Sequence, residues 1–219
     1  SLSVSLSLSF LIISLALAPS GMSLDDFKFI YWMEWAHRMW GRTLGLAFLL
    51  PAAFFTARGW VRGPLARRLA LLGAAGGGQG LVGWWMVRSG LEEPAEAWET
   101  PRVSPVRLAA HLTSAFAIFL TLLYTSFQLT WPGPPPGVVG GPAAAAAVTT
   151  LRRAAHPLAG LIALTALSGA FVAGLDAGRA FNTWPEMGGD GVFCPPEYWS
   201  EGGPAGAASG TAPAQFHHR

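Results

Sequence analysis

The stretch Phe27-Lys-Phe-Ile-Tyr-Trp-Met-Glu-Trp-Ala-His-Arg-Met-Trp-Gly-Arg-Thr-Leu-Gly45 decides the fold of this chain. Its aromatic residues lead to a carboxylate and an imidazole three positions apart, Glu34 and His37. One helical turn places both on the same side, and Gly41 and Gly45 continue that side at four-residue steps. The residues that follow are almost all apolar. An ionisable pair at the mouth of a hydrophobic span, beside a face with room for a bulky group, indicates a functional site.

The composition is that of a membrane protein. Of the 219 residues 52% are hydrophobic and only 12% are charged, against about 25% charged in average soluble chains. The net charge is +2, and the arginines occur in short clusters between apolar runs. That distribution fits membrane topology and argues against nucleic-acid binding, which needs a basic solvated face. The lone cysteine, Cys194, excludes an intramolecular disulfide and a cysteine-based metal cluster, so the histidines carry the metal-binding interest.

Four stretches reach the roughly 20 apolar residues that cross about 30 Å of hydrocarbon. They are residues 35–57, 68–88, 106–131 and 154–178. Glycines and alanines in the second and fourth, including Gly73, Gly169 and Gly174, suit close helix packing. We therefore predict an all-α polytopic membrane protein whose residues 22–190 form an antiparallel transmembrane four-helix bundle.

The flanking segments are of other kinds. Residues 1–21 form an apolar segment that is a partial match to a signal peptide or a first helix. The Pro/Gly/Ala-rich residues 133–147 and 202–214 are predicted to be flexible connectors. Residues 191–219 are expected to form an outer loop that leads toward a further helix.

Charges in the loops predict the sides of the membrane. Arginines without acids follow the first span and precede the fourth, which the positive-inside rule places on the cytoplasmic or matrix side; they are Arg58, Arg62, Arg67, Arg68, Arg152 and Arg153. The two remaining loops are acidic and are predicted to lie outside, with Glu92, Glu93, Glu96 and Glu99 in one and Glu186, Asp190, Glu197 and Glu201 in the other.

This topology brings two histidines to comparable depth. His37 lies at the outer end of the first span and His111 near the outer end of the third, followed on its face by Ala115. Two imidazoles facing each other across a bundle can hold a haem iron from both axial sides. The competing interpretation is that each histidine only hydrogen-bonds at a helix interface. Their matched depth beside small residues favours ligation.

Three further histidines are open to other interpretations. His156 falls on the inner side, next to arginines, and is best explained as a residue at the start of a helix near lipid headgroups. His217 and His218 lie on the outer side, and either could begin a further helix that carries a ligand. A similar echo, His37-Arg38 and His218-Arg219, hints at a second related half.

Two polar side chains in or near the spans also have alternatives. The spacing of Glu34 from His37 favours a functional carboxylate, although Glu34 could instead pair with Arg38 or Arg42. Gln79 could line a cavity or bond a neighbouring helix.

Four segments of this sequence resemble the haem A synthase family in its mitochondrial and alphaproteobacterial form. They are residues 27–42, the Gln-Gly-Leu-Val-Gly-Trp-Trp run of 79–91, the Arg-Val-Ser-Pro-Val-Arg-Leu-Ala-Ala-His run of 102–112, and residues 164–188. The resemblance implies an eight-helix membrane enzyme of two similar four-helix halves, of which this chain holds one half, incomplete. It also implies oxidation of a ring methyl of haem O to the formyl group of haem A, for assembly of cytochrome c oxidase.

The resemblance assigns roles to individual residues. It implies that His37 and His111 are axial ligands to the iron of the substrate haem O, and that Glu34 is catalytic. Gln215, Phe216, His218 and Arg219 match a family motif, Gln-Phe-x-His-Arg. That match implies that His218, not His217, is a third iron ligand, in a haem b site of the second half.

The same resemblance sets expectations for location, partners and extent. The protein is expected in the mitochondrial inner membrane or a bacterial plasma membrane, multi-pass, with the histidine pair toward the outer side. Expected partners are the lipid bilayer, haem O and the haem O synthase that supplies it, an electron donor such as a ferredoxin, cytochrome c oxidase assembly factors, and a second copy of the chain. The family's first helix and its helices after His218 have no counterpart here, which predicts a fragment.

Two functions of other classes remain as alternatives. One is a bis-histidine b-type membrane cytochrome that transfers electrons and leaves its haem unchanged. The other is an inactive fragment with only a structural role in the membrane.

Overall fold

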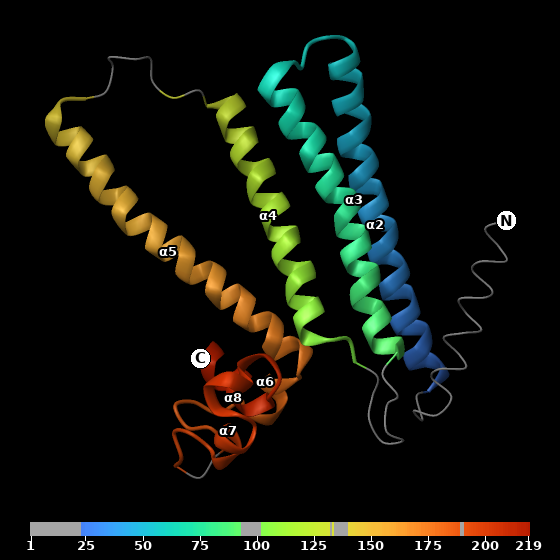
Figure 1. The fold of residues 1–219 in the computed structure, drawn as a ribbon, viewed down its shortest axis with the longest axis vertical. Helices are drawn as coiled ribbons and strands as arrows, with labels where there is room; N and C mark the ends of the chain where they lie inside the picture. The colour runs from blue at the N-terminus through green and yellow to red at the C-terminus, as the bar shows by residue number, and fades with distance from the viewer. Residues whose placement is uncertain (1–22, 93–101, 132, 134–139, 189–190) are drawn as a thin grey trace. The chain divides into compact units, whose positions relative to one another are not determined.

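A computed structural model describes residues 23–92, 102–131, 133, 140–188 and 191–219 (Figure 1). Within these ranges every regular element is a helix, which confirms the all-α membrane class. The apolar segment 1–21 and most of the first acidic loop, with Glu93, Glu96 and Glu99, lie outside the described residues. The chain divides into two units, residues up to Arg102 and residues from Val103 on, and each is described by itself.

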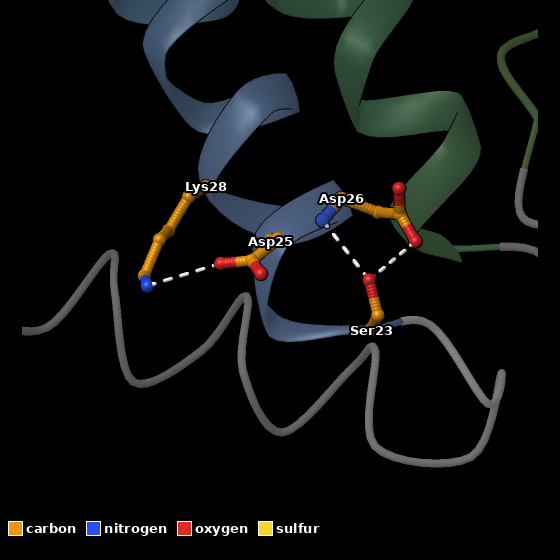
Figure 2. A network of polar contacts seen from close by, with 4 residues as sticks. All are labelled: Ser23, Asp25, Asp26 and Lys28. Atoms are coloured by element: carbon orange, nitrogen blue, oxygen red, sulfur yellow. Dashed lines mark hydrogen bonds and ion pairs between the residues drawn. The ribbon is translucent and has the colours of Figure 1, made fainter.

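Helix α2, Leu24–Ala57, begins eleven residues before the predicted span because its first turn is well capped. The hydroxyl of Ser23 accepts a hydrogen bond from the Asp26 amide at 3.2 Å and donates one to the Asp26 carboxylate at 2.5 Å (Figure 2). Lys28 pairs with Asp25 at 3.3 Å. A side-chain cap satisfies an amide that has no partner within the helix, and acids in the first turn complement the helix dipole. The polar approach to the span is therefore helical.

The first unit is an antiparallel pair of helices, α2 and α3, Gly63–Glu92 (Figure 1). Gly73 explains how closely they pack, since a Cβ there would lie 3.0 Å from Leu49 Cδ2 on α2. Gly76, Gly77 and Gly80, also predicted as packing residues, have open space where a side chain would stand. One glycine of that series therefore makes the contact between the two helices.

The second unit begins with another antiparallel pair, α4, Pro105–Thr130, and α5, Pro142–Gly174 (Figure 1). Helix α4 matches its predicted span within a residue, and it is capped by Ser104, whose hydroxyl accepts from the Arg107 amide. Helix α5 starts twelve residues earlier than the predicted span, so residues 142–147 are helical where a flexible connector was predicted. The alanine-rich sequence from Pro142 explains this, because alanine is the strongest helix former and proline suits the first helical position.

The long helices expose apolar side chains along their length, as helices in lipid do. On α5, Leu161 and Leu164 are 61% and 65% exposed. By length and composition α2, α4 and α5 can each cross a membrane, whereas α3 is not among these candidates. Glycines, Gln79 and several arginines lower the hydropathy of α3. The chain is thus a multi-pass helical membrane protein, while the packing of all four long helices into one bundle stays a prediction.

A small helical cap, residues 176–188 and 191–219, follows α5. Asp176 turns the chain at the end of α5 with a left-handed φ of 51°, a conformation that Asp tolerates better than most residues. The helices of the cap are α6, Ala177–Ala180, α7, Pro196–Ser200, the 3₁₀ helix η2, Gly203–Ala208, and α8, Thr211–His218. Its core is formed by Met187, Tyr198 and Ala212, which are 1%, 5% and 0% exposed.

The predicted flexible connector 202–214 is therefore wrong as far as these residues are concerned, because η2 and most of α8 occupy it. Close packing around Glu201 explains the order. A side chain at Gly206 would collide with the Glu201 carbonyl, and one at Gly210 would approach the Glu201 carboxylate to 2.8 Å. The glycines that suggest flexibility in the sequence are here the residues that permit tight contacts.

A pair of glycines on α5 tests the close approach of α4 and α5. A Cβ on Gly174 would lie 3.0 Å from the backbone Cα of Pro105, whereas nothing lies within 4 Å of one on Gly160. We expect Gly174→Ala to destabilise the protein by about 1–3 kcal/mol through overpacking. Gly160→Ala should be neutral or stabilising by up to about 1 kcal/mol because alanine favours helices. Thermal unfolding in detergent measures both, and equal midpoints for the two variants would contradict the assigned contact.

Candidate functional site

The structure places Glu34 and His37 together on α2, one turn apart. Both the Nε and the Nη2 of Arg38 donate to Glu34 Oε1, at 2.8 and 2.7 Å, so Glu34 forms the ion pair that was its alternative interpretation. The side chain of Glu34 remains 45% exposed. His37 is exposed, and nothing lies within 4 Å of a Cβ built on Gly41 or Gly45. This face of α2 is open, as predicted.

His111 lies on α4, in its second turn, and is half-buried. It belongs to the second unit, whereas His37 belongs to the first. Because the two units are described separately, the pairing of His37 with His111 stays a prediction.

Two other histidines have local partners. His156 lies well inside α5, not at its start, and its Nδ1 is 2.6 Å from the carbonyl oxygen of Arg152 one turn earlier. The Nε2 of His217 is 3.3 Å from the hydroxyl of Tyr198, and His217 is exposed.

His218 contacts a polar side chain on another helix. Its Nδ1 is 2.8 Å from the hydroxyl of Ser168 on α5, fifty positions away in the sequence. The Ser168 hydroxyl donates its own proton to the Thr165 carbonyl at 3.0 Å. With its proton on that carbonyl, the hydroxyl accepts from Nδ1–H, and Nε2 is then the nitrogen with the free lone pair. A neutral imidazole fixed in this way is the form that binds a metal.

The other members of the predicted motif hold α8 in the cap. The amide of Gln215 donates to the Phe181 carbonyl at 2.7 Å, and Phe216 packs on Tyr198 with ring centroids 4.8 Å apart. The guanidinium of Arg219 donates to the Glu186 carbonyl at 3.0 Å and lies 5.0 Å from the centre of the Trp184 ring. These contacts leave His218 as the motif residue that reaches α5.

A pocket of about 430 Å³ adjoins His218. Its walls come from α5, η2 and α8, and they are largely apolar: Leu161, Leu164, Thr165, Leu167, Ser168, Phe171, Ala207, Ala208, Ala214, His217 and His218. Small-molecule and cofactor sites span about 300–1,000 Å³ and combine apolar walls with a few placed polar groups. This pocket has that character.

Sequence reasoning missed three residues of this arrangement. Ser168 and Tyr198 are the partners of His218 and His217, and Glu201 accepts a hydrogen bond from the Ala212 amide at 2.9 Å, at the start of α8. A signal for Ser168 existed, namely a polar residue next to Gly169 in an otherwise apolar span. Gly169 itself was interpreted as a helix-packing residue, but the atom nearest to its Cβ position is Cε1 of His218, at 3.2 Å.

Among the residues that the structure describes, no three His, Cys, Asp or Glu side chains gather as a metal-ion site. A porphyrin brings four of its own nitrogens to its iron, so single histidines suffice for a haem. A haem site does not need such a group of side chains.

The fold and these histidines define a multi-pass helical membrane protein with an imidazole presented to an apolar pocket. The chain belongs to the COX15-CtaA family of cytochrome oxidase assembly proteins, which residues 13–219 match. It is 53% identical over 168 residues to the Heme A synthase COX15 of Arabidopsis thaliana and 52% identical over 168 residues to that of Homo sapiens. It is 45% identical over 205 residues to the Heme A synthase of Rhodospirillum centenum. The predicted family is thereby confirmed.

These matches cover most of this chain and less of the relatives. The aligned residues make up 77%, 76% and 93% of the chain, in the same order. They make up 36%, 39% and 50% of the three relatives, so the chain spans about half their length or less. No solved structure matches the chain.

The carboxylate of Glu201 should stabilise the helix that carries His218. Glu201→Ala removes the acceptor for the Ala212 amide, a loss comparable to removal of a helix cap, about 0.5–2 kcal/mol. We expect several-fold faster amide hydrogen exchange at Ala212 and Ala214, and a smaller change in Glu201→Gln, which keeps an acceptor oxygen.

Glu197→Ala is the matched control, because Glu197 lies four residues earlier and its carboxylate has no hydrogen-bond partner among the described residues. Its exchange rates at α8 should equal those of the unchanged protein. Equal rates in Glu201→Ala would show that this capping bond does not order α8.

Proposed function

We propose that this chain carries out, or forms part of a protein that carries out, the synthesis of haem A. The reaction is oxidation of a ring methyl of haem O to a formyl group, in two successive oxidations that need dioxygen and an electron source. The observation that carries the proposal is the 53% identity over 168 residues to a relative named Heme A synthase. The family match over residues 13–219 includes all four candidate site residues.

The proposed ligands of the substrate haem are His37 and His111. Each lies on a long helix that is apolar enough to cross a membrane. The open face of α2 at Gly41 and Gly45 supports the assignment, since a flat macrocycle needs space beside its axial ligand. When bound, the haem iron supplies the redox chemistry, and the chain supplies axial nitrogens, orientation and a site from which water is excluded.

Glu34 is the proposed catalytic carboxylate. It lies one turn from His37, and the pair with Arg38 holds its Oε1 in place. Among the described residues no hydrogen bond or ion pair involves its Oε2, which leaves that oxygen for a substrate group. A fixed carboxylate in this position can accept a proton from the substrate methyl carbon or stabilise positive charge that develops there.

His218 is proposed as an axial ligand of a second haem, of the b type. The residues present fit that group. A bare Nε2 is fixed through Nδ1, Gly169 leaves the imidazole room against α5, and the adjoining pocket is largely apolar. His217 fits less well, because its Nε2 is engaged by Tyr198.

The remaining assignments follow from the proposed reaction. The protein would lie in the mitochondrial inner membrane or a bacterial plasma membrane, with the histidine pair toward the outer side. It would receive haem O from a haem O synthase and electrons from a ferredoxin-type donor. The product would pass to cytochrome c oxidase assembly factors, and a second copy of the chain is a further proposed partner.

The proposed role of Glu34 is tested by removing its charge. In membranes supplied with haem O, Glu34→Gln should keep bound haem but lower haem A formation by about 10²–10⁴-fold, the usual contribution of a general acid–base group. Extracted haems are separated and quantified by chromatography. Asp25→Asn is the control, since Asp25 is also a carboxylate on α2 paired with a nearby cation, Lys28. Undiminished haem A from Glu34→Gln would overturn the role.

The unchanged chain separates the two candidate functions. Haem A in its extracts supports the synthase, whereas only unmodified haem b would favour a b-type cytochrome.

The two adjacent histidines of α8 should respond differently to substitution. His218→Ala should abolish one population of histidine-bound haem in the optical and electron paramagnetic resonance spectra. His217→Ala should leave that population in place, because its imidazole bonds to Tyr198. The reverse result would make His217 the ligand.

A further inference from the structure

We propose that Ser168 is the positioning residue of this second haem site: its hydroxyl fixes the tautomer and the ring plane of His218. The inference rests on the proposed ligand role of His218 and adds a residue that this role does not itself require. It is carried by a contact between α5 and α8, within one unit of the chain.

The Ser168 hydroxyl has two polar neighbours, and the Thr165 carbonyl is the one that can only accept a proton. A hydroxyl has one proton to give, and here it goes to the Thr165 carbonyl at 3.0 Å. In that arrangement the oxygen accepts a hydrogen bond from His218 Nδ1–H across the 2.8 Å contact. Protonation of Nδ1 leaves Nε2 unprotonated in the neutral ring. Ser168 thus selects the tautomer whose lone pair lies at Nε2.

Gly169 determines how closely the His218 ring approaches α5. A Cβ at this position would lie 3.2, 3.7 and 3.8 Å from three atoms of the imidazole, Cε1, Nε2 and Nδ1. The ring therefore lies against the bare backbone of α5 at Gly169 while Ser168 holds one of its edges. Any larger residue than glycine would push the imidazole away from the hydroxyl.

A hydrogen bond from the far nitrogen of a ligating imidazole raises its basicity and fixes its orientation, and its loss lowers metal affinity by about 10–100-fold. Ser168→Ala should therefore weaken haem binding at this site by that factor. It should also raise the reduction potential of the bound haem, because a less basic ligand stabilises the ferric state less. Ser168→Thr keeps the hydroxyl and should restore both properties in part or in full.

The test uses the full chain in detergent, titrated with ferric haem b and followed by optical spectra and redox potentiometry. The component to watch is the one that His218→Ala removes. Thr149→Ala is the matched control, because Thr149 is also on α5 but its hydroxyl donates only to its own helix, to the Ala145 carbonyl. Helical content by circular dichroism must be equal in all variants compared.

The possible outcomes distinguish the role of Ser168 from the ligand role of His218. Weaker binding and a higher potential in Ser168→Ala, with recovery in Ser168→Thr and no change in Thr149→Ala, would support the positioning role. Unchanged affinity and potential in Ser168→Ala, while His218→Ala loses the component, would overturn the role of Ser168 alone. If His218→Ala loses no component, the ligand role of His218 and this inference both fail.

If Ser168→Ala loses helical content, Gly169→Ala decides the question. It leaves the hydroxyl in place and displaces the ring, so a shifted potential with normal helicity supports the contact and an unshifted potential overturns it.

Discussion

The contact between the His218 imidazole and α5 is the interaction on which the candidate site of the second unit depends. The contact needs a helix face with no side chain at Gly169 and a hydroxyl one residue earlier. It also needs a short helix, α8, that places His218 beside these two residues of α5. The contact forms only when all three are present. A polar group in an apolar span is costly unless it is bonded, and Ser168 is bonded both to its own helix and to the imidazole.

The packing of the cap explains how α8 is held beside Ser168 and Gly169. Its core residues Met187, Tyr198 and Ala212 are almost fully buried, whereas Trp184, Phe193 and Trp199 are exposed. Backbone groups provide much of the remaining attachment, since Gln215 donates to one carbonyl and Arg219 to another. Charged and amide side chains that bond loop carbonyls fix irregular segments which have no helix or sheet partners. The cap is thus held by polar contacts around a small core.

The sequence predicted the long helices well, because twenty apolar residues bounded by charge have few other structures available in a membrane. The boundaries were less predictable. Hydropathy marks the part of a helix that can enter lipid, whereas α2 and α5 continue beyond it for reasons of capping and alanine propensity. The prediction of a flexible connector at 202–214 was wrong for a different reason. Low complexity measures composition, whereas the order of this segment comes from contacts of Glu201 with Gly206, Gly210 and Ala212.

The residues of the candidate site also fall into two groups, those that the sequence identifies and those that only the fold identifies. Glu34, His37 and His111 could be selected from the sequence because they are rare ionisable residues in apolar surroundings, where each needs a reason to be present. Serine and glycine, by contrast, are common in membrane helices. Their function depends on which side chain contacts them. Only the fold brings His218, fifty residues later, onto Ser168 and Gly169. The proposed ligands could therefore be selected from the sequence pattern, whereas the proposed orienting groups are identified only from the packing of one helix against another.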